Sequence, residues 1–204
     1  MLLIEIKNKR GEFVAKIKIR NILGKDIESV VDIQISGWQS AYKGIISDKY
    51  LNSLNKDELI LKRKNDYQQD GYIVAEINEE IVGFCRYVDN NSYTSNMEEI
   101  DCEIVALYVK PNFKYKGIGT KMFLYVVKEF KRKKKTKMII WCLKDNEPSK
   151  KFYTKMGGEI IGEKIALIGD ENYTEVGFLY NIWVKYDWRF LLIEYVKITE
   201  NNHI

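Results

Sequence analysis

Histidine is almost absent from this sequence, and its scarcity excludes two common kinds of active site. The single histidine is His203, one residue from the end of the given sequence. A zinc site built on imidazoles and a Ser-His-Asp triad both need histidines within the folded core. We therefore expect no metal centre and no nucleophile that is activated by histidine.

Cysteine is also scarce, and its placement argues against a disulfide framework. The three cysteines, Cys85, Cys102 and Cys142, form an odd and widely spaced set, each inside an apolar run typical of a strand. A disulfide-stapled domain or a zinc site would place its cysteines in regularly spaced pairs. The pattern predicts buried free thiols.

Long apolar runs and proline-rich linkers are missing as well. No uninterrupted apolar run approaches the roughly 18 residues of a membrane span, and Glu5 and Lys7 interrupt the first segment too early for a signal-peptide core. The only prolines are Pro111 and Pro148, and there is no repeat or low-complexity segment. We expect a single domain over residues 1–204, in the cytoplasm and without membrane contact.

The charge is modest but unevenly spread. The formal net charge is +4, and a basic run covers residues 131–135 together with Lys137. This run closes an expected helix, where cations interact favourably with the negative end of the helix dipole. Nucleic-acid binding is the alternative interpretation, but no stacking or groove-reading motif accompanies the run. We favour a solvated helix end and expect no nucleic-acid partner.

The most informative segment joins a strand-like run, residues 102–109, to an apolar-periodic helix expected over residues 116–134. The turn between them contains Gly117 and Gly119. A glycine turn at a helix N-terminus presents free backbone N–H groups and the positive end of the helix dipole, which suit a phosphate or pyrophosphate. Alone, such a turn is weak evidence, because it also occurs as plain structural punctuation.

Two motifs together resemble those of the Gcn5-related N-acetyltransferases, the GNAT family. The first is the acyl-CoA-binding motif V-x-P-x-x-(Q/R)-x-x-G-x-(G/A), whose places are filled here by Val109, Pro111, Lys114, Gly117 and Gly119. Lys114 stands where the family has Gln or Arg, and it keeps a cation there. The second, over residues 146–158, is similar to N-x-x-(A/S)-x-x-F-Y-x-(K/R)-x-G-F, with glycine in place of the last phenylalanine.

The resemblance implies an α/β fold of the α+β type. We expect a mixed, mostly antiparallel central sheet of about seven strands flanked by about four helices, with the family core over residues 17–185. A hairpin within residues 1–16 and a strand within residues 186–204 would be additions. Because both additions are apolar and β-prone, we expect them to pair with each other or with a second copy, which would make a homodimer.

The resemblance also implies acetyl-CoA as a co-substrate. Its pyrophosphate would lie on the backbone of residues 116–120, and its pantetheine arm would bond the strand before the turn like an added strand. Asn146 would bond the same arm, although an ordinary helix N-cap is an equal alternative. The predicted cofactor-binding residues are Leu107, Tyr108, Val109, Lys114, Tyr115, Lys116, Gly117, Ile118, Gly119, Thr120, Asn146 and Ser149.

Two residues are candidates for catalysis. Tyr153 matches the family tyrosine that reaches the CoA sulfur, and the alternative is a tyrosine packed beside Phe152. Glu103 lies eleven residues before Lys114, which is the spacing of the general base in the histone-acetylating branch. Strand alternation predicts that Glu103 shares a face with residues 105, 107 and 109. A water relay in place of the glutamate and a solvated strand-end carboxylate are the alternatives.

An aromatic pair completes the candidate site. Trp38 and Tyr42 are spaced i and i+4 in a segment similar to the first-helix region of bacterial GNAT proteins, which borders the acceptor pocket. They line that pocket or belong to the core. The resemblance implies an N-acetyltransferase that acts on a small-molecule or peptide amine by direct attack, and a non-catalytic acyl-CoA-binding regulatory module is the alternative. Polyamines, aminoglycosides, amino acids, peptide N-termini and protein lysines all stay open as acceptors.

Overall fold

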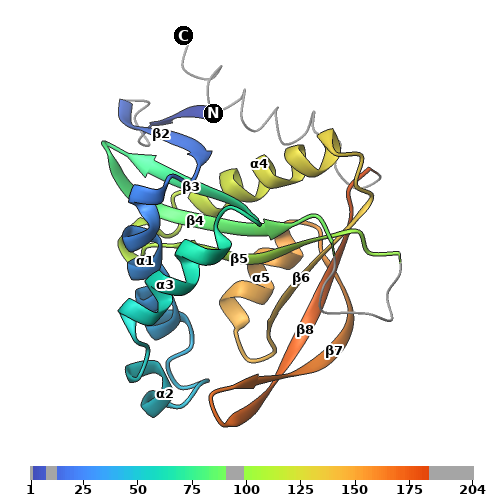
Figure 1. Ribbon diagram of the computed structural model, residues 1–204. Coiled ribbons are helices and arrows are strands. Elements are labelled where there is room, and N and C mark those ends of the chain that lie inside the picture. Colours follow the sequence, from blue (N-terminus) through green and yellow to red (C-terminus); the bar gives the residue numbers. More distant parts are fainter. Residues whose placement is uncertain (1, 8–12, 91–98, 184–204) are drawn as a thin grey trace.

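The computed structural model describes residues 2–7, 13–90 and 99–183, and one mixed sheet organises them (Figure 1). The sheet has eight strands in the order β1-β2-β3-β4-β5-β6-β8-β7. The strands are β1 Leu2–Lys7, β2 Phe13–Asn21, β3 Gly71–Ile77, β4 Glu80–Val88, β5 Cys102–Val109, β6 Lys137–Leu143, β7 Glu159–Ile168 and β8 Glu171–Asn181. The helices are α1 Ile27–Ala41, α2 Asp48–Asn52, α3 Lys56–Asp66, α4 Ile118–Arg132 and α5 Glu147–Lys155, with short 3-10 turns at η1 Gly24–Asp26 and η2 Pro111–Phe113.

The predicted mixed, mostly antiparallel sheet is confirmed. Every neighbouring pair of strands is antiparallel except β5 and β6, which are joined by the α4 crossover and run parallel. Strands β1 and β2 pair antiparallel, as expected for the N-terminal hairpin. The strand predicted within residues 186–204, and with it the pairing that would make a homodimer, lies outside the described residues.

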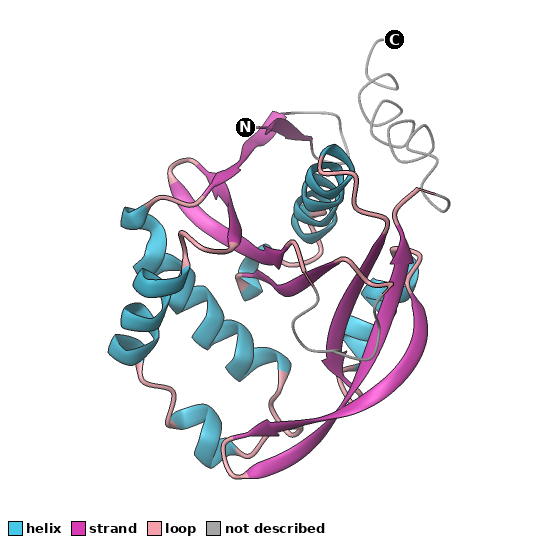
Figure 2. Ribbon diagram, turned by 45° about the vertical axis from the view of Figure 1, so that its right-hand side comes forward, coloured by secondary structure: helices cyan, strands magenta, loops and turns pink. Residues whose placement is uncertain are grey.

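Helices cover both faces of the sheet (Figure 2). On one face, α4 buries a stripe that includes Met122, Phe123, Val126 and Phe130 against the central strands. On the other face, α1 contacts β4 and β5, and α3 packs on α1. These two layers exclude water from the centre of the sheet, which supplies most of the favourable free energy of folding. The predicted thiols lie in this core, since Cys85, Cys102 and Cys142 are all free and buried.

The parallel strands β5 and β6 separate soon after they meet. They pair only at Cys102 with Met138 and at Glu103 with Ile139. Beyond these two pairs the register ends, while β5 continues along β4 as far as the pair of Gly83 with Val109. The remaining length of β5 therefore turns one edge towards an opening rather than towards a neighbouring strand.

A β-bulge in β5 corrects one of the predictions made from the sequence. Arg86 pairs with Ala106 and Tyr87 pairs with Ile104, so Val105 is an extra residue without a register partner. Because a bulge of one residue reverses the alternation of side chains, the prediction that Glu103 shares a face with residues 105, 107 and 109 is wrong. Leu107 and Val109 pack with Ile104 on the α4 side of the sheet. Glu103 instead projects to the opposite face, together with Tyr108 beyond the bulge.

None of the helices in the described part of the chain combines the length and the apolar composition that a membrane span requires.

Candidate active site

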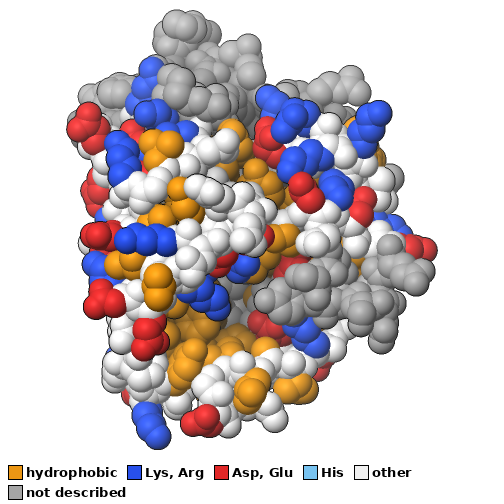
Figure 3. Space-filling view, viewed as in Figure 1, with side chains coloured by type: hydrophobic (Ala, Val, Ile, Leu, Met, Phe, Trp, Pro, Cys, Tyr) orange, Lys and Arg blue, Asp and Glu red, His pale blue; other side chains and the backbone are white. Residues whose placement is uncertain are grey.

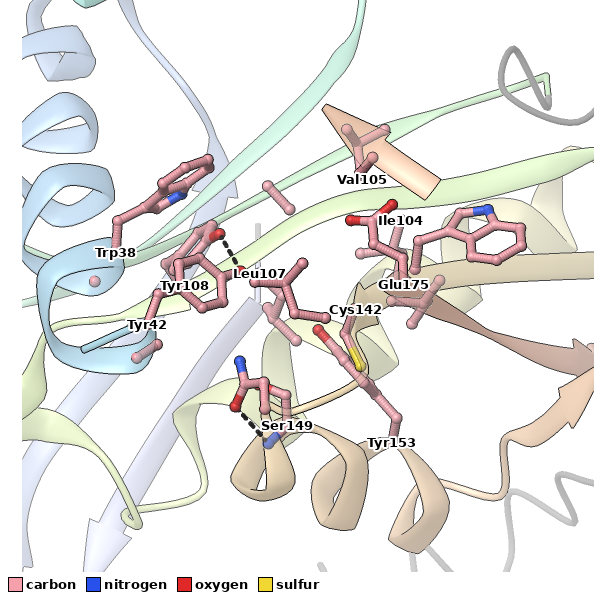
Figure 4. Close-up of a pocket in the computed structure, with 18 of the residues that line it drawn as sticks. Trp38, Tyr42, Ile104, Val105, Leu107, Tyr108, Cys142, Ser149, Tyr153 and Glu175 are labelled. Carbon is pink, nitrogen blue, oxygen red and sulfur yellow. Dashed lines mark hydrogen bonds between the residues drawn. The ribbon is translucent and has the colours of Figure 1, made fainter. Parts of the chain in front are cut away.

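A cavity of about 300 Å³ lies where β5 and β6 separate (Figure 4). In the space-filling view, hydrophobic side chains gather along a hollow on this face of the molecule (Figure 3). The cavity takes residues from α1, β5, β6, α5, β7 and β8, and it is of the size of small-ligand pockets. Its walls are Gly37, Trp38, Ala41, Tyr42, Ile104, Val105, Ala106, Leu107, Tyr108, Val109, Lys114, Ile140, Trp141, Cys142, Leu143, Asn146, Ser149, Tyr153, Ala166, Ile168 and Glu175.

The free edge of β5 provides the backbone groups of this cavity. Leu107, Tyr108 and Val109 line it, and on their other side they are held in register by β4. Alternate N–H and C=O groups of a strand point to opposite edges, so the edge away from β4 carries groups that the departed β6 does not bond. An extended ligand can bind there as an added strand.

The turn before α4 has the backbone shape of an anion cradle. Tyr115 has a φ of 62° and Gly117 has a φ of 76°, so two residues of this short turn adopt the left-handed region. Gly117 is the N-cap of α4 and has no side chain with which to cap the helix, which leaves the first N–H groups of the helix to other partners. Left-handed residues next to a helix start form a concave nest of N–H groups, and such a nest suits a phosphate or pyrophosphate.

The start of α4 also packs closely on α5. A Cβ atom added to Gly119 would lie 3.7 Å from the Phe152 ring and 3.9 Å from Val109, which are ordinary contacts. The start of α4 therefore lies near both α5 and β5. A small side chain in place of Gly119 would fit there without a clash. The predicted cradle residues Tyr115, Lys116, Gly117, Ile118, Gly119 and Thr120 do not line the cavity itself, whereas Lys114, at the head of the turn, does.

Helix α5 contributes a capped N-terminus and a buried phenol. Asn146 is 3% exposed, and its Oδ1 accepts a hydrogen bond from the Ser149 N–H at 3.3 Å. Both residues line the cavity, so the N-cap predicted for Asn146 is observed, while the side-chain amide N–H groups are not used by that cap. One residue therefore combines a structural role with a place in the cavity wall.

Tyr153 points from α5 into the cavity (Figure 4). Its ring packs against Phe152 and Phe178, with ring centroids 5.4 and 5.6 Å away. Burial raises the pKa of its hydroxyl well above the usual range, so the phenol is protonated and can donate a hydrogen bond at neutral pH. Tyr153 therefore packs beside Phe152, as the alternative interpretation expected, and it also lines the cavity.

The predicted aromatic pair lies on the α1 side of the cavity. Trp38 and Tyr42 form an edge-to-face pair with centroids 5.2 Å apart. The Tyr42 hydroxyl is 3.2 Å from the Tyr108 hydroxyl, and all three side chains line the cavity. The pair also packs with Leu51 and Leu143 in a small apolar cluster. Both sequence-based alternatives, pocket wall and core, therefore apply to these residues.

Glu103 lies close to the cavity but does not line it. The residue is 3% exposed, and its Oε2 is buried with no hydrogen-bond partner in the described part of the chain. Burial raises the pKa of its carboxyl to about 7; Lys164 and Arg86 lower it, and Glu175 adds to the increase. The solvated-carboxylate alternative is therefore wrong, because this carboxyl is removed from water.

Replacing Glu103 with glutamine is expected to stabilise the protein above neutral pH. The folded pKa exceeds the unfolded value of about 4.3, so ionisation costs stability as the pH rises through this window, and the cost is complete above about pH 7. The full cost corresponds to about 4 kcal/mol. Because a buried amide still lacks partners, we expect a net gain of about 1–2 kcal/mol in the free energy of unfolding.

Urea unfolding at about pH 5 and about pH 8 checks this prediction, since the gain should appear mainly at the higher pH. Glu163→Gln is the matched control, because the Glu163 side chain is 49% exposed and pairs with Lys144 on the surface. A gain for Glu103→Gln that is the same at both pH values would contradict a carboxyl whose pKa is raised in the fold.

The structure adds residues that the sequence motifs did not indicate. Trp141 and Cys142 come from β6, Ala166 and Ile168 from β7, and Glu175 from β8. Only the alternation of Trp141 and Leu143 on one face of β6 could have suggested part of this wall. Nothing local in the sequence indicates that the β7–β8 hairpin closes the cavity.

The sequence profile described as the acetyltransferase (GNAT) family matches residues 38–158 of this chain. An uncharacterised N-acetyltransferase of Methanocaldococcus jannaschii is 28% identical over 147 residues, which cover 69% of this chain and 60% of that protein. The chain therefore spans less than two thirds of that relative's length. A spermidine N(1)-acetyltransferase of Thermoplasma acidophilum is 24% identical over 153 residues, covering 71% of this chain and 89% of that protein.

Solved structures share the fold. The PaiA N-acetyltransferase from Thermoplasma acidophilum, crystallised in complex with coenzyme A, aligns with a TM-score of 0.62 and 22% identity, covering 78% of this chain and 97% of that one. YncA from Salmonella typhimurium, solved with its cofactor acetyl-CoA, aligns with a TM-score of 0.61 and 16% identity, covering 81% of this chain and 94% of that one. At these identities the likeness establishes the fold.

Proposed function

The chain belongs to the acetyltransferase (GNAT) family, and from this premise we propose that it transfers the acetyl group of acetyl-CoA to a primary amine by direct attack. One observation carries the proposal: the free edge of β5 and the buried Tyr153 phenol line one cavity, and the turn before α4 adjoins it through Lys114. This arrangement would hold the pyrophosphate and the pantetheine arm of a thioester co-substrate, and it would supply a proton donor for the thiolate that leaves.

The co-substrate would be held by backbone groups rather than by charged side chains. The nest of N–H groups at residues 115–120 would bind the pyrophosphate, and the free edge of Leu107, Tyr108 and Val109 would bond the pantetheine arm. An N–H group of this edge would also stabilise negative charge that develops on the thioester oxygen, a type of contact worth about 2.7–4 kcal/mol in other enzymes. Acetyl-CoA supplies the activated acetyl group when bound.

The attacking amine must first lose a proton. Glu103 has a pKa of about 7, which suits a general base at neutral pH. Because Glu103 does not line the cavity, we propose that a water molecule carries the proton from the ammonium towards its carboxylate. As the carbon–sulfur bond breaks, Tyr153 would donate its hydroxyl hydrogen to the departing sulfur, and the phenol would regain a hydrogen from the nitrogen that has attacked. CoA then leaves as the thiol and the tyrosine is neutral again.

Direct attack is favoured over a covalent enzyme intermediate. Cys142 lines the cavity, but burial raises the pKa of its thiol to about 12, so the nucleophilic thiolate is scarce at neutral pH. The amine itself is then the strongest nucleophile that the cavity receives. No group of the protein needs to carry the acetyl group in this route.

Asn146 allows a test that separates helix capping from co-substrate binding. Asn146→Ala is expected to lower the free energy of unfolding by about 1 kcal/mol through loss of the cap, and to raise the KM for acetyl-CoA. Asn146→Asp keeps the oxygen that accepts from Ser149 N–H but lacks the amide donors, so its stability should be retained while the KM still rises. An aspartate variant with wild-type KM and stability would leave Asn146 as a cap only.

A screen of amine acceptors that measures CoA release with a thiol reagent tests the proposed function. At least one primary amine is expected to accelerate CoA release above the rate of hydrolysis. Tight binding of acetyl-CoA together with no acceleration by any class of amine would favour the alternative, a regulatory module that binds acyl-CoA without catalysis.

A further inference from the structure

We propose that Glu175 determines acceptor specificity by binding a second positive charge on the acceptor, and that the Lys164 ammonium occupies this carboxylate until the acceptor replaces it. The acceptor class that follows is a primary amine with another cationic group across a short apolar spacer. This inference rests on the proposed function, because it places the acceptor in the cavity described above.

Among the described residues that line the cavity, Glu175 is the acidic one. It projects from β8 on the side of the cavity that lies across from Trp38 and Tyr42 (Figure 4). Its cross-strand neighbour on β7 is Lys164, and the Lys164 Nζ lies 3.4 Å from Glu175 Oε2. The Glu175 side chain is 20% exposed, so it is partly removed from water yet reachable from the cavity.

The Glu175 carboxylate already binds the Lys164 ammonium, and two features of this contact indicate that a substrate ammonium could take its place. The Lys164 Nζ lies 4.3 Å from the centre of the Trp141 ring, so the indole face and the carboxylate together surround one cation. The distance of 3.4 Å to Glu175 is longer than the 2.7–2.9 Å of a strong charge-assisted hydrogen bond. A substrate ammonium that reaches a shorter distance would therefore compete well with Lys164.

The burial of Glu103 is an independent indication that this side of the cavity favours a cation. Its Oε2 is buried and has no partner among the described residues, and its charge interacts with those of Lys164 and Glu175. The other nearby cation, Arg86, is already paired with Asp70 at 2.6 Å. Lys164 pairs with Glu175 and also acts on the charge of Glu103, so a second ammonium entering the cavity would offset negative charge that these described residues leave.

The rest of the cavity suits an apolar spacer. Trp38 and Tyr42 form one wall, while Ala166 and Ile168 of β7 lie on the hairpin that carries Lys164. A short methylene chain can pack between these side chains, with the reacting nitrogen near Tyr153 and the second charge near Glu175. An acceptor with an uncharged tail of the same length would not displace Lys164 from Glu175. It would therefore gain no binding free energy from this carboxylate.

The test compares 1,4-diaminobutane with butylamine, which differ by one ammonium group. For Glu175→Gln, we expect the KM for 1,4-diaminobutane to rise about tenfold or more, because hydrogen bonds to charged groups have this magnitude, while the KM values for butylamine and acetyl-CoA stay within about twofold. For Lys164→Met, we expect the KM for 1,4-diaminobutane to fall about threefold or more, since the competing ammonium is gone.

Glu163→Gln is the matched control, because it removes a carboxylate from the same hairpin that pairs with Lys144 outside the cavity. It should leave both amines unaffected. Equal changes in KM for the two amines in Glu175→Gln, or an unchanged KM for the diamine in both Glu175→Gln and Lys164→Met, would overturn the inference.

A binding measurement separates this inference from the proposed function. Calorimetric titration of 1,4-diaminobutane into the wild-type protein loaded with CoA detects the cation site without turnover. Binding that is lost in Glu175→Gln and kept in Lys164→Met supports the site even if no amine is acetylated. Absence of binding to the wild-type protein overturns the inference, even if other amines are acetylated.

Discussion

Replacing Gly117 with valine is expected to weaken acetyl-CoA binding by at least about a hundredfold. Gly117 has a φ of 76°, and a residue with a side chain costs roughly 1–2 kcal/mol in this region, more when it is β-branched. The distorted turn would also lose N–H contacts with the pyrophosphate, each worth about 1.5–3 kcal/mol when the acceptor is charged. Calorimetric titration with CoA measures the loss directly.

Gly44 offers a control with the same backbone conformation. It also has a φ of 76°, nothing lies within 4 Å of a Cβ atom added to it, and it is not part of the cavity wall. Gly44→Val should therefore carry a similar backbone strain without weakening the binding of CoA. A folded Gly117→Val protein with wild-type affinity, or equal losses in the two variants, would remove the turn before α4 as the pyrophosphate site.

The second large effect is expected at Tyr153. Tyr153→Phe should lower kcat by about a hundredfold, the lower end of the range for general acid catalysis, because a thiolate leaves readily. The KM for acetyl-CoA should change little, since the hydroxyl acts on charge that develops at sulfur during the reaction. Single-turnover kinetics at saturating acetyl-CoA measure the chemical step without interference from product release.

Tyr87→Phe is the matched control for this substitution. Tyr87 is 6% exposed and stacks edge-to-face on Phe130, on the α4 side of the core and away from the cavity. The same loss of a buried hydroxyl there should leave kcat near the wild-type value. If Tyr153→Phe also turns over at the wild-type rate when chemistry is limiting, the tyrosine is a packing residue only.

The parts of the site that the sequence predicted are those determined by neighbours along the chain. The turn at Gly117 and the cap at Asn146 each depend on a few adjacent residues, so their motifs placed them correctly. Tyr153 lies on the short helix that this cap begins, and its catalytic role stays a prediction. The strand and helix order around these motifs also predicted the mixed sheet, because a parallel pair of strands needs a crossover such as α4.

The bulge in β5 shows why side-chain direction was harder to predict. Val105 is one extra residue, and the run from Cys102 to Val109 is apolar enough that no break in alternation marks it. The prediction put the Glu103 side chain on the wrong face of the sheet because of this single residue. The bulge also has a structural consequence, because a bulged strand bends, and β5 leaves β6 close to this point.

The acceptor side of the cavity depends on contacts between distant segments. Trp141 and Glu175 line the same cavity because β6 and β8 are neighbours in the sheet, although more than thirty residues separate them in the sequence. Lys164 reaches the same place through the register of β7 with β8. Neither pairing has a local signature, so a motif search cannot find this wall.

The central claim, direct transfer of an acetyl group from acetyl-CoA to an amine in this cavity, is tested most directly by mass spectrometry with an isotope-labelled acetyl group. After incubation with 1,4-diaminobutane, we expect one labelled acetyl group on the amine for each CoA released, and an unlabelled intact protein when the amine is omitted. A labelled acetyl group on Cys142, or CoA release without an acetylated amine, would contradict the account.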